Sequence, residues 1–253
     1  MVPTICGGGD ITTAPKDSAG QPAGGTHLSP QEFHTAMQRK GVVLLDCRND
    51  YEYAIGRFEG ATNPGTKHFH EFADYVRHHK AEWQARKTPL LMYCTGGVRC
   101  ETASAFMLAE GLEDVSQLRG GIHRYLEAFP RDGGAWRGRN FVFDARVSMG
   151  PPELPAAEAT VVGRCSIGCG KACERLTGDR VCSVCKDLVL VCDTCDAQPA
   201  NRDLFCSQHE SLRGAVWVAC CLRLPFLNRS PKFHSRLLQS HHLWALKVTA
   251  SVA

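Results

Sequence analysis

Two short, uninterrupted apolar runs constrain the fold of this chain more than any other feature. The first is "GVVLLDC" over residues 41–47 and the second is "TPLLMYC" over residues 88–94. Apolar runs of this length without polar alternation are typical of strands buried on both faces, as in a parallel sheet. Segments with helical or strand-like spacing alternate around them, at 69–84, 100–111, 115–121, 122–129 and 139–147. The alternation predicts an α/β domain with a mainly parallel central sheet flanked by helices.

Shifts in composition divide the 253 residues into five parts. Residues 1–25 are rich in Gly, Pro, Thr and Ala and predict a flexible lead-in. A helix start follows in "LSPQEFH", where Ser29 is a candidate N-cap, Pro30 takes the first helical position and Glu32 lies three residues past the cap. The expected parts after the lead-in are the α/β domain over 26–147, a Pro/Ala-rich linker over 148–163, a small cysteine-rich domain over 164–210 and a basic tail over 211–253.

Charge, hydropathy and cysteine content limit the compartment and the partners. The basic excess lies in residues 211–253, which hold six Lys or Arg and no Asp or Glu, so it does not by itself predict a nucleic-acid-binding body. No apolar run reaches the roughly 18–20 residues of a membrane-spanning helix, and the first residues do not resemble a secretory signal. We therefore expect a cytoplasmic protein without membrane partners, in which clustered cysteines indicate metal rather than disulfides.

The segment "YCTGGVRCE" over residues 93–101 carries the strongest signal for chemistry. Cys94 ends a buried strand, and a helix begins a few residues later. The turn in front of Arg99 contains small or flexible residues whose backbone N–H groups can face inward, namely Thr95, Gly96, Gly97 and Val98. The helix N-terminus and the arginine both favour an anion at the centre of this turn. The pattern predicts a low pKa and a nucleophilic role for Cys94, whereas the plainer alternative is a buried structural cysteine.

Several residues near Cys94 have more than one interpretation. Arg99 is either an anion-binding side chain or a helix-start cation, and the unfavourable helix dipole favours the first role. Cys100 either resolves a persulfide or sulfenate on Cys94 or packs in the first helical turn. Arg48 is expected to pair with Asp46 and shape the pocket, and it is also a candidate substrate contact. Phosphatase loops of the Cys…Arg type hold five intervening residues, so the four residues here disfavour phosphate chemistry.

Four short-spaced pairs of metal-ligand residues follow the linker. They are Cys165/Cys169, Cys182/Cys185, Cys192/Cys195 and Cys206/His209. Thiolates and imidazoles at such spacings are typical ligands of structural zinc, and four pairs suffice for two ions, with Cys173 left over. A set of reduced thiols without metal is the disfavoured alternative, and the sequence leaves open which pairs combine. A region this short has little apolar core, so we expect metal to supply most of its folding free energy.

Three motifs together resemble the rhodanese superfamily. "YCTGGVRCE" resembles its active-site loop, "LLDCRNDYEYAIGRFEGATN" resembles its Asp-x-Arg…Glu signature, and "LRGGIHRYLEAFP" resembles its Leu-x-Gly-Gly turn. With "LSPQEFH" and "NFVFDARV", the pattern is similar to the rhodanese-like bacterial tRNA wobble-uridine hydroxylases. It is also similar to the eukaryotic thiosulfate sulfurtransferase/rhodanese-like domain-containing proteins. The resemblance covers about residues 26–210 and includes a C-terminal cysteine-rich domain.

The resemblance implies a rhodanese-like fold and an enzyme that acts through Cys94. In sulfurtransferases this cysteine takes sulfur from a small donor as a persulfide, whereas in the hydroxylases the loop is implicated in adding oxygen to a wobble uridine of tRNA. Both activities stay open at this point, with tRNA and a small sulfur donor as candidate partners and zinc as the expected cofactor. A non-catalytic rhodanese-plus-zinc module that binds a protein or RNA partner is the alternative.

The two ends of the sequence carry fewer signals of structure or function than the segments between them. Family members usually carry another domain ahead of the rhodanese part, and only about 25 residues precede "HLSPQEF" here, so we do not expect that domain. The tail over 211–253 resembles nothing in the family. Its basic composition suits RNA phosphates, but disorder or a translated non-coding extension are the favoured interpretations.

Overall fold

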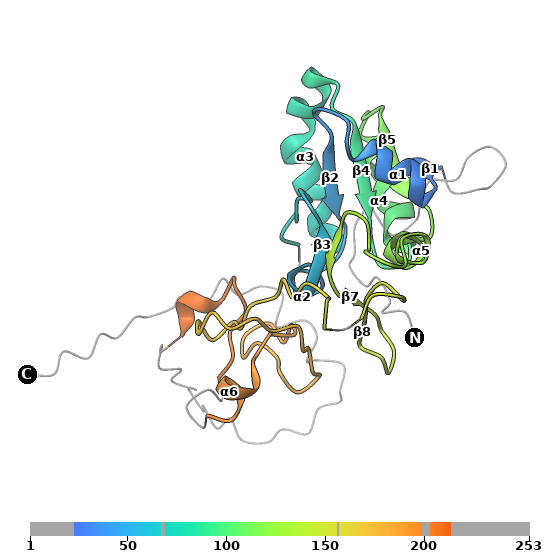
Figure 1. Ribbon diagram of the computed structural model, residues 1–253. Helices are drawn as coiled ribbons and strands as arrows, with labels where there is room; N and C mark the ends of the chain where they lie inside the picture. Colours follow the sequence, from blue (N-terminus) through green and yellow to red (C-terminus); the bar gives the residue numbers. More distant parts are fainter. Residues whose placement is uncertain (1–22, 67–68, 156, 199–202, 214–253) are drawn as a thin grey trace, which may run out of the picture.

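A four-stranded parallel sheet forms the centre of the larger domain. The computed structural model describes residues 23–66, 69–155, 157–198 and 203–213 (Figure 1). The sheet has the order β1-β5-β4-β2, with all neighbours parallel. Its strands are β1 (Thr26–Leu28), β2 (Val43–Asp46), β4 (Leu90–Tyr93) and β5 (Val115–Leu118). The predicted α/β class with a parallel sheet is confirmed, whereas most of the predicted lead-in and nearly all of the predicted tail lie outside the described residues.

Helices cover both faces of this sheet, which explains the uninterrupted apolar runs. Along β4, Leu90 and Met92 pack in the core cluster of α3 (Phe69–Arg86) and α4 (Val98–Ala109). The alternating residues Leu91 and Tyr93 pack in the opposite cluster, with α1 (Pro30–Ala36) and α5 (Gly121–Ala128). Both faces of the strand are therefore buried, and alternation between polar and apolar residues is absent along it.

Local capping signals fix the helix ends where the sequence predicts them. The Ser29 hydroxyl accepts from the backbone N–H of Glu32, and the Glu32 carboxylate accepts from the backbone N–H of Ser29, which forms the predicted capping box at α1. At the C-terminal end of α4, Gly111 follows the C-cap with a positive φ of 82°. A glycine in that conformation ends a helix without steric cost.

A second layer, which the sequence analysis did not predict, lies at the carboxyl edge of the sheet. It contains the short helix α2 (Asp50–Ile55) and the antiparallel pair of β3 (Gly56–Phe58) and β6 (Trp136–Gly138). The segment over 139–147, predicted as a strand or an extended segment, contains only the two-residue strand β7 (Asn140–Phe141), which pairs with β8 (Ser148–Met149) in a hairpin. The second strand of this hairpin falls in the predicted linker, so the domain boundary at residue 147 stays a prediction.

The cysteine-rich block packs against this second layer. Figure 1 shows the block, with α6 (Asp193–Asp196) and the short 3-10 helix η2 (Glu210–Leu212), at the end of the sheet where α2 and β7 lie. Ile55 of α2 and Phe141 of β7 belong to the same buried cluster as the block's cysteines and leucines. The Gln208 amide also donates to Asp50 and to the backbone oxygen of Gly65. None of the helices that the structure describes is long and apolar enough to cross a membrane.

Candidate functional site

Cys94 lies directly after β4, at the point where the chain turns into α4. Its side chain is almost fully buried, with 1% of the residue exposed. Gly97 is the N-cap of α4 and adopts a left-handed conformation with a φ of 91°, which glycine tolerates best. The turn therefore brings the first backbone N–H groups of the helix back toward the cysteine, as the sequence predicts.

The Cys94 sulfur lies in a ring of hydrogen-bond donors. The Gly97 backbone N–H donates to its Sγ at 3.1 Å, and the backbone N–H groups of Arg99 and Cys100 also point to it. The pKa of Cys94 is lowered to about 6. The largest cause is a hydrogen bond from the Cys100 thiol; burial opposes the shift, and the charge of Arg99 and the backbone donors add to the lowering. The thiolate is therefore the main form of Cys94 at neutral pH, as a nucleophile requires.

Two further cysteines, Cys100 and Cys47, pack in the same buried cluster as Cys94. Cys100 is completely buried, and burial together with contacts to the Cys47 and Cys94 thiols raises its pKa well above the ordinary value. Cys100 therefore stays protonated and can donate to the Cys94 thiolate. Cys47, which follows β2, was not singled out in the sequence, because its proximity depends on the pairing of β2 with β4. The predicted resolving and packing roles of Cys100 both stay predictions. The structure adds a third role, because the Cys100 thiol donates a hydrogen bond to the Cys94 sulfur.

Arg99 is held by a carboxylate rather than pointing freely into the turn. Its guanidinium donates to both oxygens of Glu52, at 2.8 and 2.9 Å, and to the Thr95 hydroxyl at 3.3 Å. The Thr95 hydroxyl in turn donates to Glu52 at 3.2 Å. Burial raises the pKa of Glu52, but hydrogen bonds and charge from Arg99 outweigh it and hold that pKa below its ordinary value. The carboxylate therefore fixes the arginine beside the turn, where its charge favours a thiolate or another anion.

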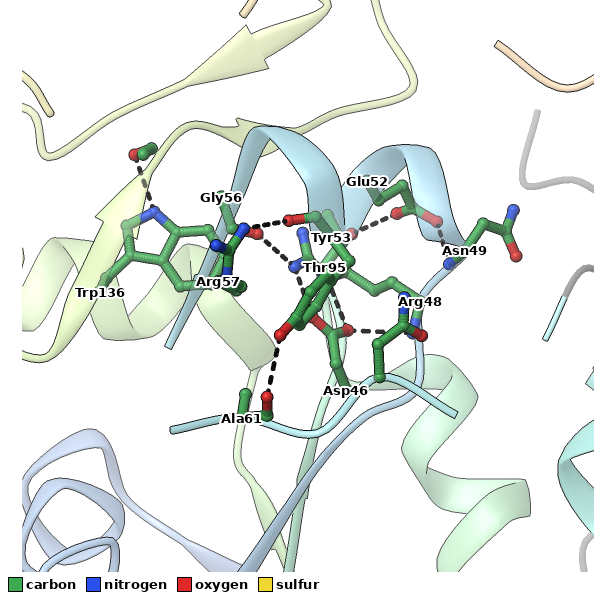
Figure 2. A network of polar contacts seen from close by, with 12 residues as sticks. Asp46, Arg48, Asn49, Glu52, Tyr53, Gly56, Arg57, Ala61, Thr95 and Trp136 are labelled. Atoms are coloured by element: carbon green, nitrogen blue, oxygen red, sulfur yellow. Dashed lines mark hydrogen bonds and ion pairs between the residues drawn. The ribbon is translucent and has the colours of Figure 1, made fainter. Parts of the chain in front are cut away.

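Arg48 lies deeper than the cysteine turn, in a network with Asp46 (Figure 2). Its guanidinium donates to both Asp46 oxygens, at 2.8 and 2.6 Å, and to the backbone oxygen of Gly56 at 2.6 Å. The remaining face of the guanidinium approaches the rings of Tyr93 and Trp136. Both charged side chains have no exposed surface. Burial of this kind favours the predicted ion-pair role, and the predicted contact of Arg48 with substrate stays a prediction.

The Gly120–Gly121 turn packs against the cysteine turn, and the residues that follow it donate two hydrogen bonds to the backbone of the cysteine turn. The backbone N–H of Ile122 donates to the Cys94 oxygen at 3.0 Å, and that of His123 donates to the Thr95 oxygen at 3.2 Å. A Cβ atom on Gly121 would lie 2.5 Å from the Cys94 oxygen, so the two turns approach too closely for a side chain. The sequence motif "LRGG" therefore positions the cysteine turn, a role that the sequence analysis did not assign.

The cysteine-rich block brings its ligand residues together in two groups of four. The first group is Cys165, Cys169, Cys192 and Cys195, and the second is Cys182, Cys185, Cys206 and His209. In each group the side-chain ligand atoms all lie within 4.8 Å of one another. The first pair therefore combines with the third and the second with the fourth, an interleaved pairing that the sequence left open. Each group could hold a metal ion.

Distances within the groups fit a tetrahedral ion. Four sulfurs at the usual Zn–S length would be separated by roughly 3.8 Å. The Cys169–Cys192 and Cys185–Cys206 sulfurs are each 3.7 Å apart, and the Cys182 sulfur is 3.6 Å from His209 Nδ1. Cys173 is buried and belongs to neither group, as predicted for the left-over cysteine.

Two family models match the parts of the chain that contain these sites. Residues 29–128 match the family model of the rhodanese-like domain, and residues 137–210 match the model of the rhodanase C-terminal domain. The first range contains the cysteine turn, Glu52 and the Gly120–Gly121 turn. The domain that contains residues 29–128 has a rhodanese-like α/β fold. The second range contains the β7–β8 hairpin and both groups of metal-ligand residues.

The chain is also similar to curated tRNA-modifying proteins. It is 47% identical over 126 residues to the tRNA uridine(34) hydroxylase of Brucella anthropi, covering 50% of this chain and 41% of the relative. It is 49% identical over 125 residues to the protein of the same name from Synechocystis sp., covering 49% of this chain and 44% of the relative. The chain thus spans less than half the length of these relatives. Among solved structures, the rhodanese-like domain of an Anabaena sp. protein matches with a TM-score of 0.36 and 20% identity, covering 49% of this chain and 85% of that one.

Proposed function

We propose that this chain hydroxylates uridine 34 of tRNA and that Cys94 is the reacting residue. The observation that carries the proposal is the 47–49% identity to proteins named for this reaction. The site supports it, because Cys94 has a pKa of about 6 within a ring of backbone donors. A thiolate of this kind is a strong nucleophile that can act on an electron-poor pyrimidine. Because replacing a uracil C–H by C–OH is a two-electron oxidation, the proposal includes an external oxidant of the peroxide class, which supplies the oxygen atom and is itself reduced to water or an alcohol.

The surrounding residues have supporting roles in this proposal. The backbone N–H groups around Sγ stabilise negative charge on sulfur or on an atom bound to it. Arg99 supplies a full positive charge beside the turn, and Glu52 holds it there through two hydrogen bonds. Cys100 donates to the thiolate and stays protonated. The tRNA substrate implies action in the cytoplasm, where mature tRNA is used.

We also infer that both groups of metal-ligand residues bind zinc. Four thiolates, or three thiolates and one imidazole, at tetrahedral spacing form the donor sets that structural zinc sites use. The cysteines would hold the ions in the thiolate form and stabilise a block whose small buried core includes four of the ligands, Cys165, Cys182, Cys192 and Cys195. The ions lie in the block that packs on α2, so their proposed role is structural.

Sulfur transfer is a second candidate for the same cysteine. The ring of N–H donors around Sγ suits the terminal anionic sulfur of a persulfide, which a small sulfur donor would supply. A thiosulfate:cyanide assay on the wild type and Cys94→Ser measures this activity directly. Sulfur transfer predicts thiocyanate formation by the wild type alone, and equal rates for the two proteins would eliminate it.

Nucleoside mass spectrometry of tRNA tests the proposed hydroxylation. The chain would be expressed in bacteria that lack their own uridine-34 hydroxylase, and 5-hydroxyuridine derivatives in their tRNA would be measured. We expect the wild type to restore these nucleosides and Cys94→Ser to restore none. Cys173→Ser is the matched control, because Cys173 is a buried cysteine outside both the turn and the metal groups. Full restoration by Cys94→Ser, or none by a folded wild type, would refute the proposal.

A further inference from the structure

Exposed apolar side chains gather around the cysteine turn. The described residues contain five exposed large hydrophobic side chains, of which Val98 lies in the turn, Phe143 contacts Arg99 beside it, and Val147 belongs to the same hairpin as Phe143. Val98 belongs to the turn itself and is 60% exposed, while Phe143 is 46% exposed. Phe143 and Val147 belong to the turn between β7 and β8. An exposed aromatic beside a reactive cysteine needs an explanation other than core packing.

The hairpin holds Phe143 against the cysteine turn. The Phe143 ring centre lies 5.9 Å from the guanidinium carbon of Arg99, and the Phe141 ring supports it edge-on at 5.0 Å. On the second strand, Met149 Sδ lies 3.3 Å from Nδ1 of His123, whose backbone N–H is bonded to Thr95. The connection, through Phe143, and the strand β8, through Met149, therefore each contact a residue that also contacts the turn, which holds the aromatic ring beside it.

The connection between β7 and β8 has a strained backbone and exposed side chains. Val147 has a φ of 62°, a conformation that a β-branched residue rarely adopts. Its backbone oxygen accepts from Val142 at 2.8 Å, and its N–H donates to the Asp144 oxygen at 3.0 Å. An ion pair between Arg146 and Asp144 closes the tip. Backbone strain that the surroundings hold in place is found mostly at functional sites.

We propose that Phe143 is a stacking platform for an unpaired uracil base, which it places beside Cys94. The proposal rests on the proposed function and adds the residue that holds the base. Enzymes that act on a base take it out of the helical stack, and unstacked bases of RNA are held on aromatic rings and arginine planes. Phe143 provides the ring, and the Arg99 guanidinium carbon lies over it, 5.9 Å from its centre.

A nucleobase fits this patch better than a protein partner does. Three exposed apolar side chains are far fewer than the roughly 20–30 residues a side of a stable protein interface. A single aromatic ring next to a guanidinium instead matches the area of one flat base.

Fluorescence anisotropy with a labelled RNA hairpin tests the stacking role. The hairpin carries one unpaired uridine in its loop, and a second hairpin of the same sequence has an abasic site at that position. The wild type should bind the uridine hairpin more tightly than the abasic one. Loss of stacking on one aromatic costs between about 5- and 150-fold in affinity. We therefore expect Phe143→Ala to weaken binding of the uridine hairpin by this factor and to bind both hairpins equally.

Two further variants separate stacking from folding. Phe143→Trp keeps an aromatic face and should restore the preference for uridine, which a merely structural role for phenylalanine does not predict. Val161→Ala removes another exposed apolar side chain, outside the hairpin and the cysteine turn, and should bind like the wild type. The unfolding midpoint and the alkylation rate of Cys94 in each variant report whether the site is intact.

The outcomes distinguish this inference from the proposed function. Equal affinity of Phe143→Ala and the wild type for the uridine hairpin would overturn the inference while tRNA hydroxylation still stands. Equal affinity of the wild type for both hairpins would overturn it in the same way. A wild type that restores no hydroxylated uridine and binds neither hairpin would overturn both.

Discussion

The Glu52 carboxylate holds the Arg99 guanidinium by two hydrogen bonds, although the residues lie 47 positions apart. Glu52 belongs to α2 and Arg99 to the first turn of α4, so the pair joins the segment after β2 to the cysteine turn after β4. Glu52 has no exposed side-chain surface, and Arg99 has 19%. The pair therefore connects α2, on which the cysteine-rich block packs, to the arginine whose charge helps to lower the pKa of Cys94.

The first prediction concerns this buried pair. Glu52→Gln removes the negative charge and leaves the Arg99 guanidinium largely buried without its counter-ion. Breaking a buried ion pair in this way costs about 3–5 kcal/mol of unfolding free energy. We expect a loss at the lower end, about 3 kcal/mol, because the amide keeps part of the hydrogen bonding and Arg99 is partly exposed. Urea denaturation followed by circular dichroism measures it.

Glu82→Gln provides the matched control for this loss. Glu82 pairs with Arg86 one turn along α3, with more than half of both side chains exposed. Exposed pairs of this type contribute little, so its denaturation midpoint should equal that of the wild type. Equal midpoints for Glu52→Gln and Glu82→Gln would show that the Glu52–Arg99 pair does not stabilise the fold.

The second prediction is a pH dependence of Cys94 reactivity. Only the thiolate reacts with iodoacetamide, and the pKa of Cys94 is about 6. The labelling rate should therefore rise as the pH increases through about 6 and stay level above it. The same lowered pKa contributes to stability at higher pH, and this contribution is lost as the pH falls through about 6. Mass spectrometry of the Cys94 peptide measures the rate at each pH.

Cys100 variants test the cause of the low pKa. The hydrogen bond from the Cys100 thiol is its largest cause, so Cys100→Ala should move the labelling midpoint to higher pH. Cys100→Ser keeps a donor at the same position and should leave the midpoint closer to that of the wild type. An unchanged midpoint in Cys100→Ala would assign the shift to the backbone N–H groups and Arg99 instead.

The parts of the site that follow one another in sequence were predictable. Cys94, the glycine turn and the start of α4 are adjacent, and strand, turn and helix signals coincide there. The capping box from Ser29 to Glu32 spans only four residues and is predictable for the same reason. Local patterns of this kind report directly on backbone geometry, so they need no knowledge of the tertiary fold.

The parts that depend on distant contacts were not predictable. Cys47 reaches Cys100 only because β2 and β4 are neighbours in the sheet. The helix α2 has six residues, too few for a periodic signal, yet it positions Glu52. The spacing of the cysteine pairs predicts candidate ligands, but which pairs combine depends on how the block folds back on itself.

The third prediction concerns the close approach of the Gly120–Gly121 turn to the cysteine turn. In Gly121→Ala the new methyl group would meet the Cys94 and Thr95 oxygens and the Gly96 nitrogen at 2.5–2.7 Å, so the cysteine turn must shift. A displacement of about 1 Å at a reacting group can cost about 100-fold in rate. We expect a loss of that size in tRNA hydroxylation, measured by nucleoside mass spectrometry.

Gly41→Ala is the control that separates the effect of a steric clash from the effect of a positive φ. Gly41 also has a positive φ, 79°, but a Cβ atom at this position would meet nothing within 4 Å. The variant should lose about 1–2 kcal/mol of stability, as expected for an L-residue in the left-handed region, and keep its hydroxylation rate. Similar rates for the two variants would contradict a positioning role of Gly121.

The last prediction is the pairing of the metal ligands. Native mass spectrometry of the folded chain should show two zinc ions, and Cys169→Ala should lose one of them, while Cys173→Ala retains both. The double variant Cys169→Ala/Cys192→Ala decides the arrangement. Both residues belong to one group in the interleaved pairing, so one ion should remain bound to the other group. If consecutive pairs shared an ion instead, these two substitutions would damage both sites and neither ion would be retained. Because the intact group still contains Cys182, Cys185, Cys206 and His209, its ion should resist removal by a weak chelator as it does in the wild type.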